Sequence, residues 1–226
     1  MAMNRYGNAG KRRRWLSLIL LLSAVGCTIP ADQSSSPSRD RHPDPELAVG
    51  EFTLTERSGT TIRQSDFAGK VWVASFVFTR CTGPCPQVSA TMARLQKDLA
   101  AQPDLRLVTF TVDPGHDDPA ELKRYAEHFR ADPERWLFLT GPEEDVRHLL
   151  ENQFKVSAAR NPKAKDAGDQ FDHSTRLVVV DRRGLIRGYF QGIRDERSPE
   201  ADKEFEAEFQ ELKAKLATLL RGKPVN

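Results

Sequence analysis

Apolar and polar residues alternate in blocks from residue 47 onward, and each block has the period of a strand or of a helix. Val71–Phe78 is a nearly continuous run of apolar, β-branched and aromatic residues, which is typical of a central strand buried on both faces. After a short segment with two cysteines, apolar residues recur at helical spacing from Val88 to Leu99. The same patterns predict strands over Leu105–Val112, Trp136–Leu139, Thr175–Val180 and Leu185–Phe190, and helices over Pro119–Arg130, over Glu143–Phe154 and after Ser198.

Local signals mark the ends of several of these elements. Asp118 stands immediately before a predicted helix and is a candidate N-cap. Asp181–Gly184 separates the last two strands, which predicts a β-hairpin whose tight turn uses the glycine. The final helix carries one apolar stripe, formed by Phe205, Phe209, Leu212, Leu216 and Leu219.

The order of the elements predicts an α/β domain with a central mixed sheet flanked by helices. Alternating strands and helices place helices on both faces of such a sheet. A β-α-β start followed by a terminal β-β-α unit is the order of a thioredoxin-like fold. Phe52–Phe67 supplies an extra N-terminal hairpin, and the polar segment Asn161–Asp172 is predicted to be a loop.

The N-terminal region reads as a targeting segment. Residues 1–26 contain five basic residues and no acidic one, and they end in the mostly apolar stretch Trp15–Gly26. Twelve residues are too few to cross a membrane, which takes about 20, so we interpret 1–26 as a signal peptide. The alternative is a short anchor that is not cleaved. Both interpretations place the rest of the chain outside the cytoplasm.

Ala24–Cys27 is similar to a bacterial lipobox, in which Cys27 becomes the lipidated N-terminus of the mature protein. Residues 27–46 are rich in Ser, Pro and Asp and are predicted to be a flexible tether, in which His42 is a solvated residue. This gives a tether over 27–46, a globular domain over 47–221 and a tail over 222–226. The expected location is extracytoplasmic and membrane-anchored, on the periplasmic side of a bacterial membrane.

Composition and charge narrow the classes of partner. A hydrophobic fraction of 38% is enough for one sizeable core, which excludes a wholly disordered chain. The net charge is +2, but after the basic segment 29 basic residues face 32 acidic ones, a net charge of −3. With no basic stripe in the body of the chain, nucleic acid is excluded as the expected partner.

Two cysteines carry the chemistry of the globular domain. Cys81 and Cys85 lie where the central strand ends and the next helix begins, and a helix N-terminus stabilises a thiolate. Spacing of four brings both sulfur atoms to one side of a turn. Thiolates both ligate metals and attack disulfides, so copper binding and thiol–disulfide exchange both remain open, beside a plain structural disulfide.

The histidines differ in their predicted surroundings. His128 and His148 lie among charged helix residues and are expected at the surface, and His116 lies in a loop that approaches the cysteine turn or is simply solvated. His173 stands just before the first strand of the terminal hairpin, where thioredoxin-like oxidoreductases have a cis-proline. Two thiolates and one imidazole favour Cu(I) and also accept Cu(II), whereas structural zinc needs a fourth ligand.

Three signatures together resemble the Sco/SenC copper proteins. They are Phe76–Pro86 with its two cysteines, Thr111–Pro114, and Asp172–Ser174. The resemblance implies a thioredoxin fold that binds one copper ion through Cys81, Cys85 and His173. It also implies a partner, the apo CuA domain of cytochrome c oxidase subunit II, to which copper is delivered or whose cysteines are reduced.

The sequence leaves the roles of two residues beside these ligands undecided. Asp172 either orients His173 as a hydrogen-bond acceptor or is a solvated carboxylate, and Arg80 either favours the Cys81 thiolate or faces water. The function expected is a tethered copper chaperone. The rival is an extracytoplasmic thiol–disulfide reductase with Cys81 as nucleophile and Cys85 as resolving thiol, and a redox or copper sensor is a third alternative.

Overall fold

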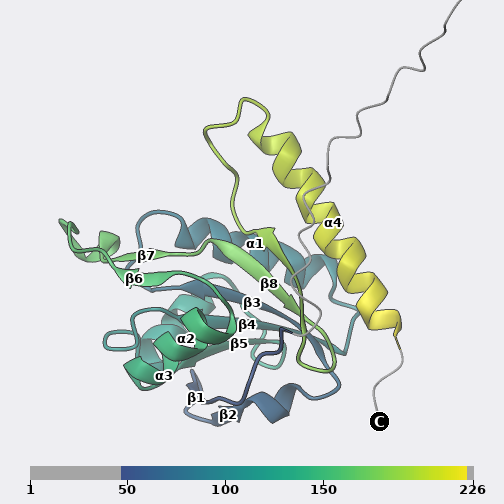
Figure 1. The fold of residues 1–226 in the computed structure, drawn as a ribbon, viewed down its shortest axis with the longest axis horizontal. Coiled ribbons are helices and arrows are strands. Elements are labelled where there is room, and N and C mark those ends of the chain that lie inside the picture. The colour runs from purple at the N-terminus through teal and green to yellow at the C-terminus, as the bar shows by residue number, and fades with distance from the viewer. Residues whose placement is uncertain (1–46, 223–226) are drawn as a thin grey trace, which may run out of the picture. The chain divides into compact units, whose positions relative to one another are not determined.

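The computed structural model describes residues 47–222, and the predicted signal peptide, Cys27 and tether lie outside the described residues. A seven-stranded sheet forms the centre of the domain, in the order β2-β1-β5-β4-β3-β8-β9 (Figure 1). Its strands are β1 (Thr53–Glu56), β2 (Thr61–Arg63), β3 (Val71–Val77), β4 (Leu105–Thr111), β5 (Trp136–Thr140), β8 (Arg176–Val180) and β9 (Ile186–Gln191). The helices are α1 (Cys85–Asp98), α2 (Pro119–His128), α3 (Glu143–His148) and α4 (Ala201–Arg221), with short 3-10 turns η1 (Gln64–Phe67) and η3 (Ala167–Asp169).

Strand β3 is the central element, and all seven of its residues are buried. It runs parallel to β4, with Val71 opposite Leu105, and antiparallel to β8, with Val73 opposite Val179. The sheet is therefore mixed, as predicted. The burial of β3 on both faces explains why its sequence is a continuous apolar run rather than an alternating one.

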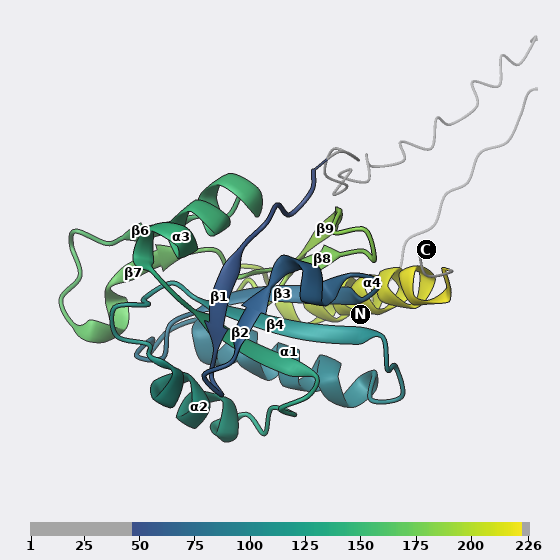
Figure 2. The ribbon, with the colours of Figure 1, turned by 90° about the horizontal axis from the view of Figure 1, so that it is seen from below.

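Helices cover both faces of the sheet. Figure 2 shows α1 and α2 on one face and α3 on the other. On the α3 face the ring of Trp72 packs edge-on against Phe154, with 5.9 Å between centroids, and on the other face Phe138 packs against Tyr125 of α2. Helix α4 lies beside α1, where the Arg94 guanidinium sits 4.0 Å above the Phe209 ring. These layers confirm the predicted α/β, thioredoxin-like architecture.

Several predicted ends are confirmed at the level of single hydrogen bonds. Strands β1 and β2 form the N-terminal hairpin, with Leu54 opposite Ile62. The Asp118 carboxylate accepts the Glu121 N–H at 2.8 Å and caps α2. In the terminal hairpin Gly184 has φ +78°, a conformation that glycine adopts without strain.

The prediction of a loop over Asn161–Asp172 is partly wrong. Strands β6 (Ala158–Arg160) and β7 (Phe171–His173) pair antiparallel in a separate two-stranded sheet, and the turn η3 lies between them. Three-residue strands are too short for an alternating pattern to show, which is why sequence periodicity missed them. The predicted helix Glu143–Phe154 also divides, because α3 continues as a π-helical stretch, η2, over Leu149–Gln153.

Within residues 47–222, none of the helices combines the length and the apolar character needed to span a membrane.

Candidate metal centre

The two cysteines lie at the junction between β3 and α1, as predicted. The N–H of Cys81 donates to the carbonyl of Phe78 at 3.2 Å, which turns the chain back after the strand. Cys85 is the first residue of α1 and follows the N-cap residue Pro84. Both side chains are free thiols; Cys85 is completely buried, whereas Cys81 keeps 8% of its surface exposed. Cys81 is therefore the thiol that a partner reaches first.

His173, the last residue of β7, points its ring at this junction. Its Nε2 atom lies 3.1 Å from the sulfur of Cys85, and the two sulfur atoms and a ring nitrogen all lie within 4.8 Å of one another. Its Nδ1 lies 3.1 Å from the carbonyl oxygen of Ser174. Because a carbonyl only accepts, Nδ1 carries the proton and Nε2 turns a lone pair toward the sulfurs. This is the tautomer that a metal ligand needs.

The two thiols are electrostatically unequal. The hydrogen bond from Cys85 lowers the pKa of Cys81 well below its ordinary value, and the backbone amides of Gly83 and Cys85 act in the same direction. Burial raises the pKa of Cys85, and the neighbouring Cys81 raises it further. The pair thus consists of one slightly exposed thiolate and one fully buried, protonated thiol.

Asp117 anchors the loop that leads to the cysteines, a role that the sequence patterns do not predict. Its carboxylate accepts the N–H and the hydroxyl of Thr79, at 3.0 and 2.6 Å, and the hydroxyl of Thr111 at 2.5 Å. Burial raises the pKa of Asp117. The only signal in the sequence is the position of this residue in the loop after a buried strand, where ligand-proximal residues of open α/β sheets gather.

Arg80 takes neither of the roles considered for it. Its Nη2 donates to the carboxylate of Asp113 at 2.5 Å and to the side-chain oxygen of Gln170 at 2.9 Å. Arg80 is therefore neither turned toward the thiolate nor simply solvated. It ties the Cys81 loop to the turn after β4 and to the β6–β7 hairpin, because a guanidinium can donate in two directions at once.

The β6–β7 hairpin packs against the loop that carries Cys81 through aromatic contacts and through a glycine at its tip. The ring of Phe78 meets those of Phe171 and His173 edge-on, at centroid distances of 5.4 and 5.6 Å. At the hairpin tip a Cβ on Gly168 would come within 2.6 Å of the Thr82 hydroxyl. Such close approach is available only to glycine.

The remaining candidates lie away from the three side chains. Asp172 is exposed, and both ring nitrogens of His173 have other neighbours, so the solvated-carboxylate interpretation applies. His128 and His148 are exposed on their helices, as predicted. His116 belongs to the turn after β4 and is not a member of the group that could hold a metal ion.

Comparison with known proteins identifies the family. A protein-family model described as SCO1/SenC matches residues 40–204. The chain belongs to the SCO1/SenC family. This SCO1/SenC protein is 31% identical over 147 residues to a protein described as a SCO1 homolog from Bacillus subtilis, a match that covers 64% of this chain and 74% of that protein. It spans about half the length of several mitochondrial relatives, 53% and 55% for those of zebrafish and cattle.

Solved structures of the family share the fold of this SCO1/SenC protein. A SCO1/SenC lipoprotein from Bacillus anthracis superposes with a TM-score of 0.63 at 29% identity, over 79% of this chain and 98% of that one. BsSco, described as a member of the Sco family of cytochrome c oxidase assembly proteins, gives 0.64 at 27% identity, over 81% and 99%. Copper-bound ScoI of Bradyrhizobium japonicum gives 0.53 at 26% identity, over 71% and 99%.

Proposed function

We propose that this protein is a copper chaperone that holds one copper ion between Cys81, Cys85 and His173. The observation that supports it most directly is the meeting of two sulfurs and one imidazole nitrogen within 4.8 Å of one another. Two soft donors and one imidazole match Cu(I), and the set also accepts Cu(II). Within the described residues no fourth His, Cys, Asp or Glu joins this group, which disfavours structural zinc.

The unequal thiols suit an ion that must be both bound and released. The Cys81 thiolate is available at neutral pH to capture copper. Cys85 gives up its proton when the cation arrives, because metal binding displaces protons from thiols. Three ligands leave copper open on its solvent side, and a client cysteine enters there and takes the ion stepwise.

The client in this proposal is the apo CuA domain of cytochrome c oxidase subunit II. It is supported by the family, one member of which is described as a cytochrome c oxidase assembly protein. We further propose that a lipid on Cys27 and the tether over 27–46 hold the domain at the outer face of the cytoplasmic membrane. A family member described as a lipoprotein supports this anchoring.

Substitution of the imidazole tests the metal centre. For His173→Ala we expect the affinity for Cu(I) to fall by at least about 100-fold, because loss of a ligand costs more than the 10- to 100-fold typical of a residue that only orients one. Anaerobic titration of the reduced domain against a Cu(I) chelator measures it, and X-ray absorption of the wild type should report two sulfurs and one nitrogen. His148→Ala, on the exposed face of α3, is the matched control. Equal affinities for wild type and His173→Ala would contradict the proposal.

A second candidate, thiol–disulfide reduction of the client, is favoured by the lowered pKa and partial exposure of Cys81. In this reaction the Cys81 thiolate attacks a client disulfide and releases one client thiolate, which takes up a proton. Cys85 then loses its proton and attacks the Cys81 sulfur of the mixed disulfide, so a Cys81–Cys85 disulfide forms. The second client thiolate leaves and takes up a proton, and the client is left with two thiols. His173→Ala separates the two functions, because disulfide exchange needs no imidazole ligand and should retain its rate.

A further inference from the structure

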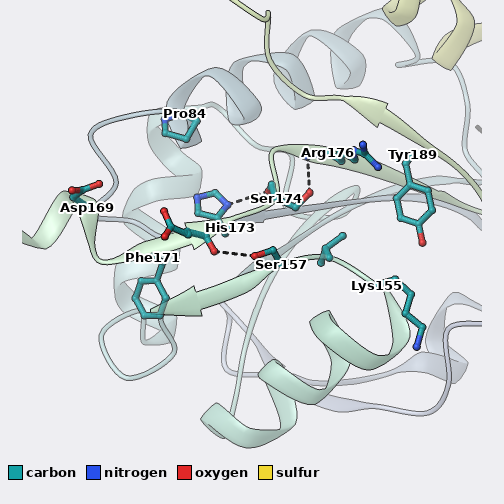
Figure 3. A pocket seen from close by; sticks show the side chains of 11 residues that line it. Pro84, Lys155, Ser157, Asp169, Phe171, His173, Ser174, Arg176 and Tyr189 are labelled. Carbon is teal, nitrogen blue, oxygen red and sulfur yellow. Dashed lines mark hydrogen bonds between the residues drawn. The ribbon is translucent and has the colours of Figure 1, made fainter. Parts of the chain in front are cut away.

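A groove of about 480 Å³ opens directly beside His173 (Figure 3). Pro84 and His173 form its wall on the side of the metal centre, and Tyr189 stands at the far end. The Tyr189 hydroxyl donates to the Phe154 carbonyl at 3.0 Å, which holds this far wall in place. A segment of a partner lying in the groove would pass immediately next to the proposed copper ligand.

The charges of the groove are divided between its two ends. Lys155 and Arg176 stand with Tyr189, whereas Asp169 lies on the opposite side of His173 (Figure 3). Lys155 and Arg176 are exposed, and neither forms an ion pair with any residue of the described range 47–222. Arg160 on the nearby hairpin is, by contrast, paired with Glu143 at 3.2 Å. The two unpaired cations form an anion-binding end of the groove.

Both cations are carried by well-defined backbone rather than by a long loop. Lys155 has φ +54° and follows Phe154, whose carbonyl is already bonded to Tyr189. The N–H of Arg176, the first residue of β8, donates to the Ser174 hydroxyl at 3.2 Å. The backbone at both positions is therefore fixed, so binding has to order only the two exposed side chains.

We propose that this groove docks an extended acidic segment of the copper client, with client carboxylates at Lys155 and Arg176 and a client metal-binding side chain over His173. The inference rests on the proposed function and adds the surface by which the client is recognised. Complementary charge steers encounter and fixes orientation, and Asp169 and Asp172 repel the same segment if it enters in the opposite direction.

The test uses charge reversal in the groove and the soluble apo CuA domain of a bacterial cytochrome c oxidase subunit II as the probe. Lys155→Glu with Arg176→Glu should leave Cu(I) affinity unchanged, because neither residue is a proposed ligand. The second-order rate of copper transfer at low salt should fall by about ten-fold or more, and its decrease with added salt should disappear. The matched control is Lys123→Glu with Arg183→Glu, two exposed cations that do not line the groove.

The neutral pair Lys155→Gln with Arg176→Gln should transfer at an intermediate rate and guards against a folding defect of the reversed variant. Transfer by the reversed variant at the wild-type rate, with the same salt dependence, would overturn the groove assignment while leaving the chaperone function intact. A wild type that loads no Cu(I), or passes none to the CuA domain, would overturn the proposed function and with it this inference. A variant that loses Cu(I) affinity itself would show that the groove acts on the metal centre and not on docking.

Discussion

Arg80 connects the loop that carries Cys81 with the hairpin that carries His173. Its two acceptors, Asp113 and Gln170, lie 33 and 90 residues away in the chain. The Arg80 Nε is buried without a partner, so the side chain is held by its terminal nitrogens alone. Arg80 therefore links the loop of the cysteines to the hairpin of the imidazole without belonging to the three side chains that could hold a metal ion.

Arg80→Gln should weaken Cu(I) binding by about three- to ten-fold, because the loss of hydrogen bonds to a charged group costs roughly 1.5–3 kcal/mol and only part of it falls on the metal centre. Competition titration with a Cu(I) chelator measures the change. Arg94→Gln breaks an ion pair with Glu206 between α1 and α4 and serves as the control, which should bind copper normally. If both variants bind copper as the wild type does, Arg80 has no positioning role.

At the scale of elements, the β6–β7 hairpin is the part of the fold that creates the site. It is separate from the main sheet and reaches the cysteine loop through Phe171, His173 and the tip at Gly168. The hairpin is small, and Phe171 is the one buried residue among residues 158–173. The packing of the hairpin against Phe78 and Thr82 should therefore decide whether His173 faces the two sulfurs.

Gly168→Val tests the packing of the hairpin tip against Thr82. A side chain at this position would collide with Thr82 and would lie 3.2 Å from the Arg80 carbonyl, so the hairpin tip must lift. Overpacking of this kind typically costs about 1–3 kcal/mol, and we expect up to about ten-fold weaker Cu(I) binding with the sheet intact. Gly115→Val is the control, because a Cβ there meets open space. Unchanged copper affinity in a folded Gly168→Val protein would contradict the role of the hairpin.

At the scale of the whole molecule, stability and metal chemistry lie at opposite ends of β3. Arg182, which is nearly buried, donates to the carbonyls of Gly69 and Leu220 and to the carboxylate of Asp104. It thereby joins the start of β3, the end of α4 and the chain before β4. The cysteines follow the other end of the same strand. A change in the hydrogen bonds of Arg182 should therefore alter the free energy of unfolding without altering the affinity for copper.

The contribution of Asp104 to the free energy of unfolding should depend on pH, and Asp104→Asn tests this. Hydrogen bonds from Lys70 and Arg182 lower the pKa of Asp104. A depressed carboxyl pKa stabilises the fold above the unfolded-state value and loses that effect as pH falls through the folded-state value. The free energy of unfolding at pH 7 should therefore be higher for the wild type than for Asp104→Asn. The difference should be at most about 1 kcal/mol, because the ion pairs are partly exposed to solvent. It should shrink below about pH 4, where the carboxyl of the unfolded chain is protonated. Urea unfolding of both proteins across pH measures it; a difference that grows on acidification would contradict the assignment.

The chain sequence by itself determined the elements and the chemistry that depend on near neighbours. The buried run of β3, the cap at Asp118 and the turn at Gly184 follow from periodicity and backbone preference over a few residues. The position of Cys81 and Cys85 at a helix start has the same local origin.

Only the tertiary structure decided how the third donor meets the other two. His173 lies 88 residues from Cys85, on a strand too short to leave a pattern, and its tautomer is set by the Ser174 carbonyl rather than by Asp172. The partners of Arg80 and the division of charge along the groove were equally out of reach. Such contacts arise when separate elements pack together, and local preferences along a chain carry no information about which distant groups will meet.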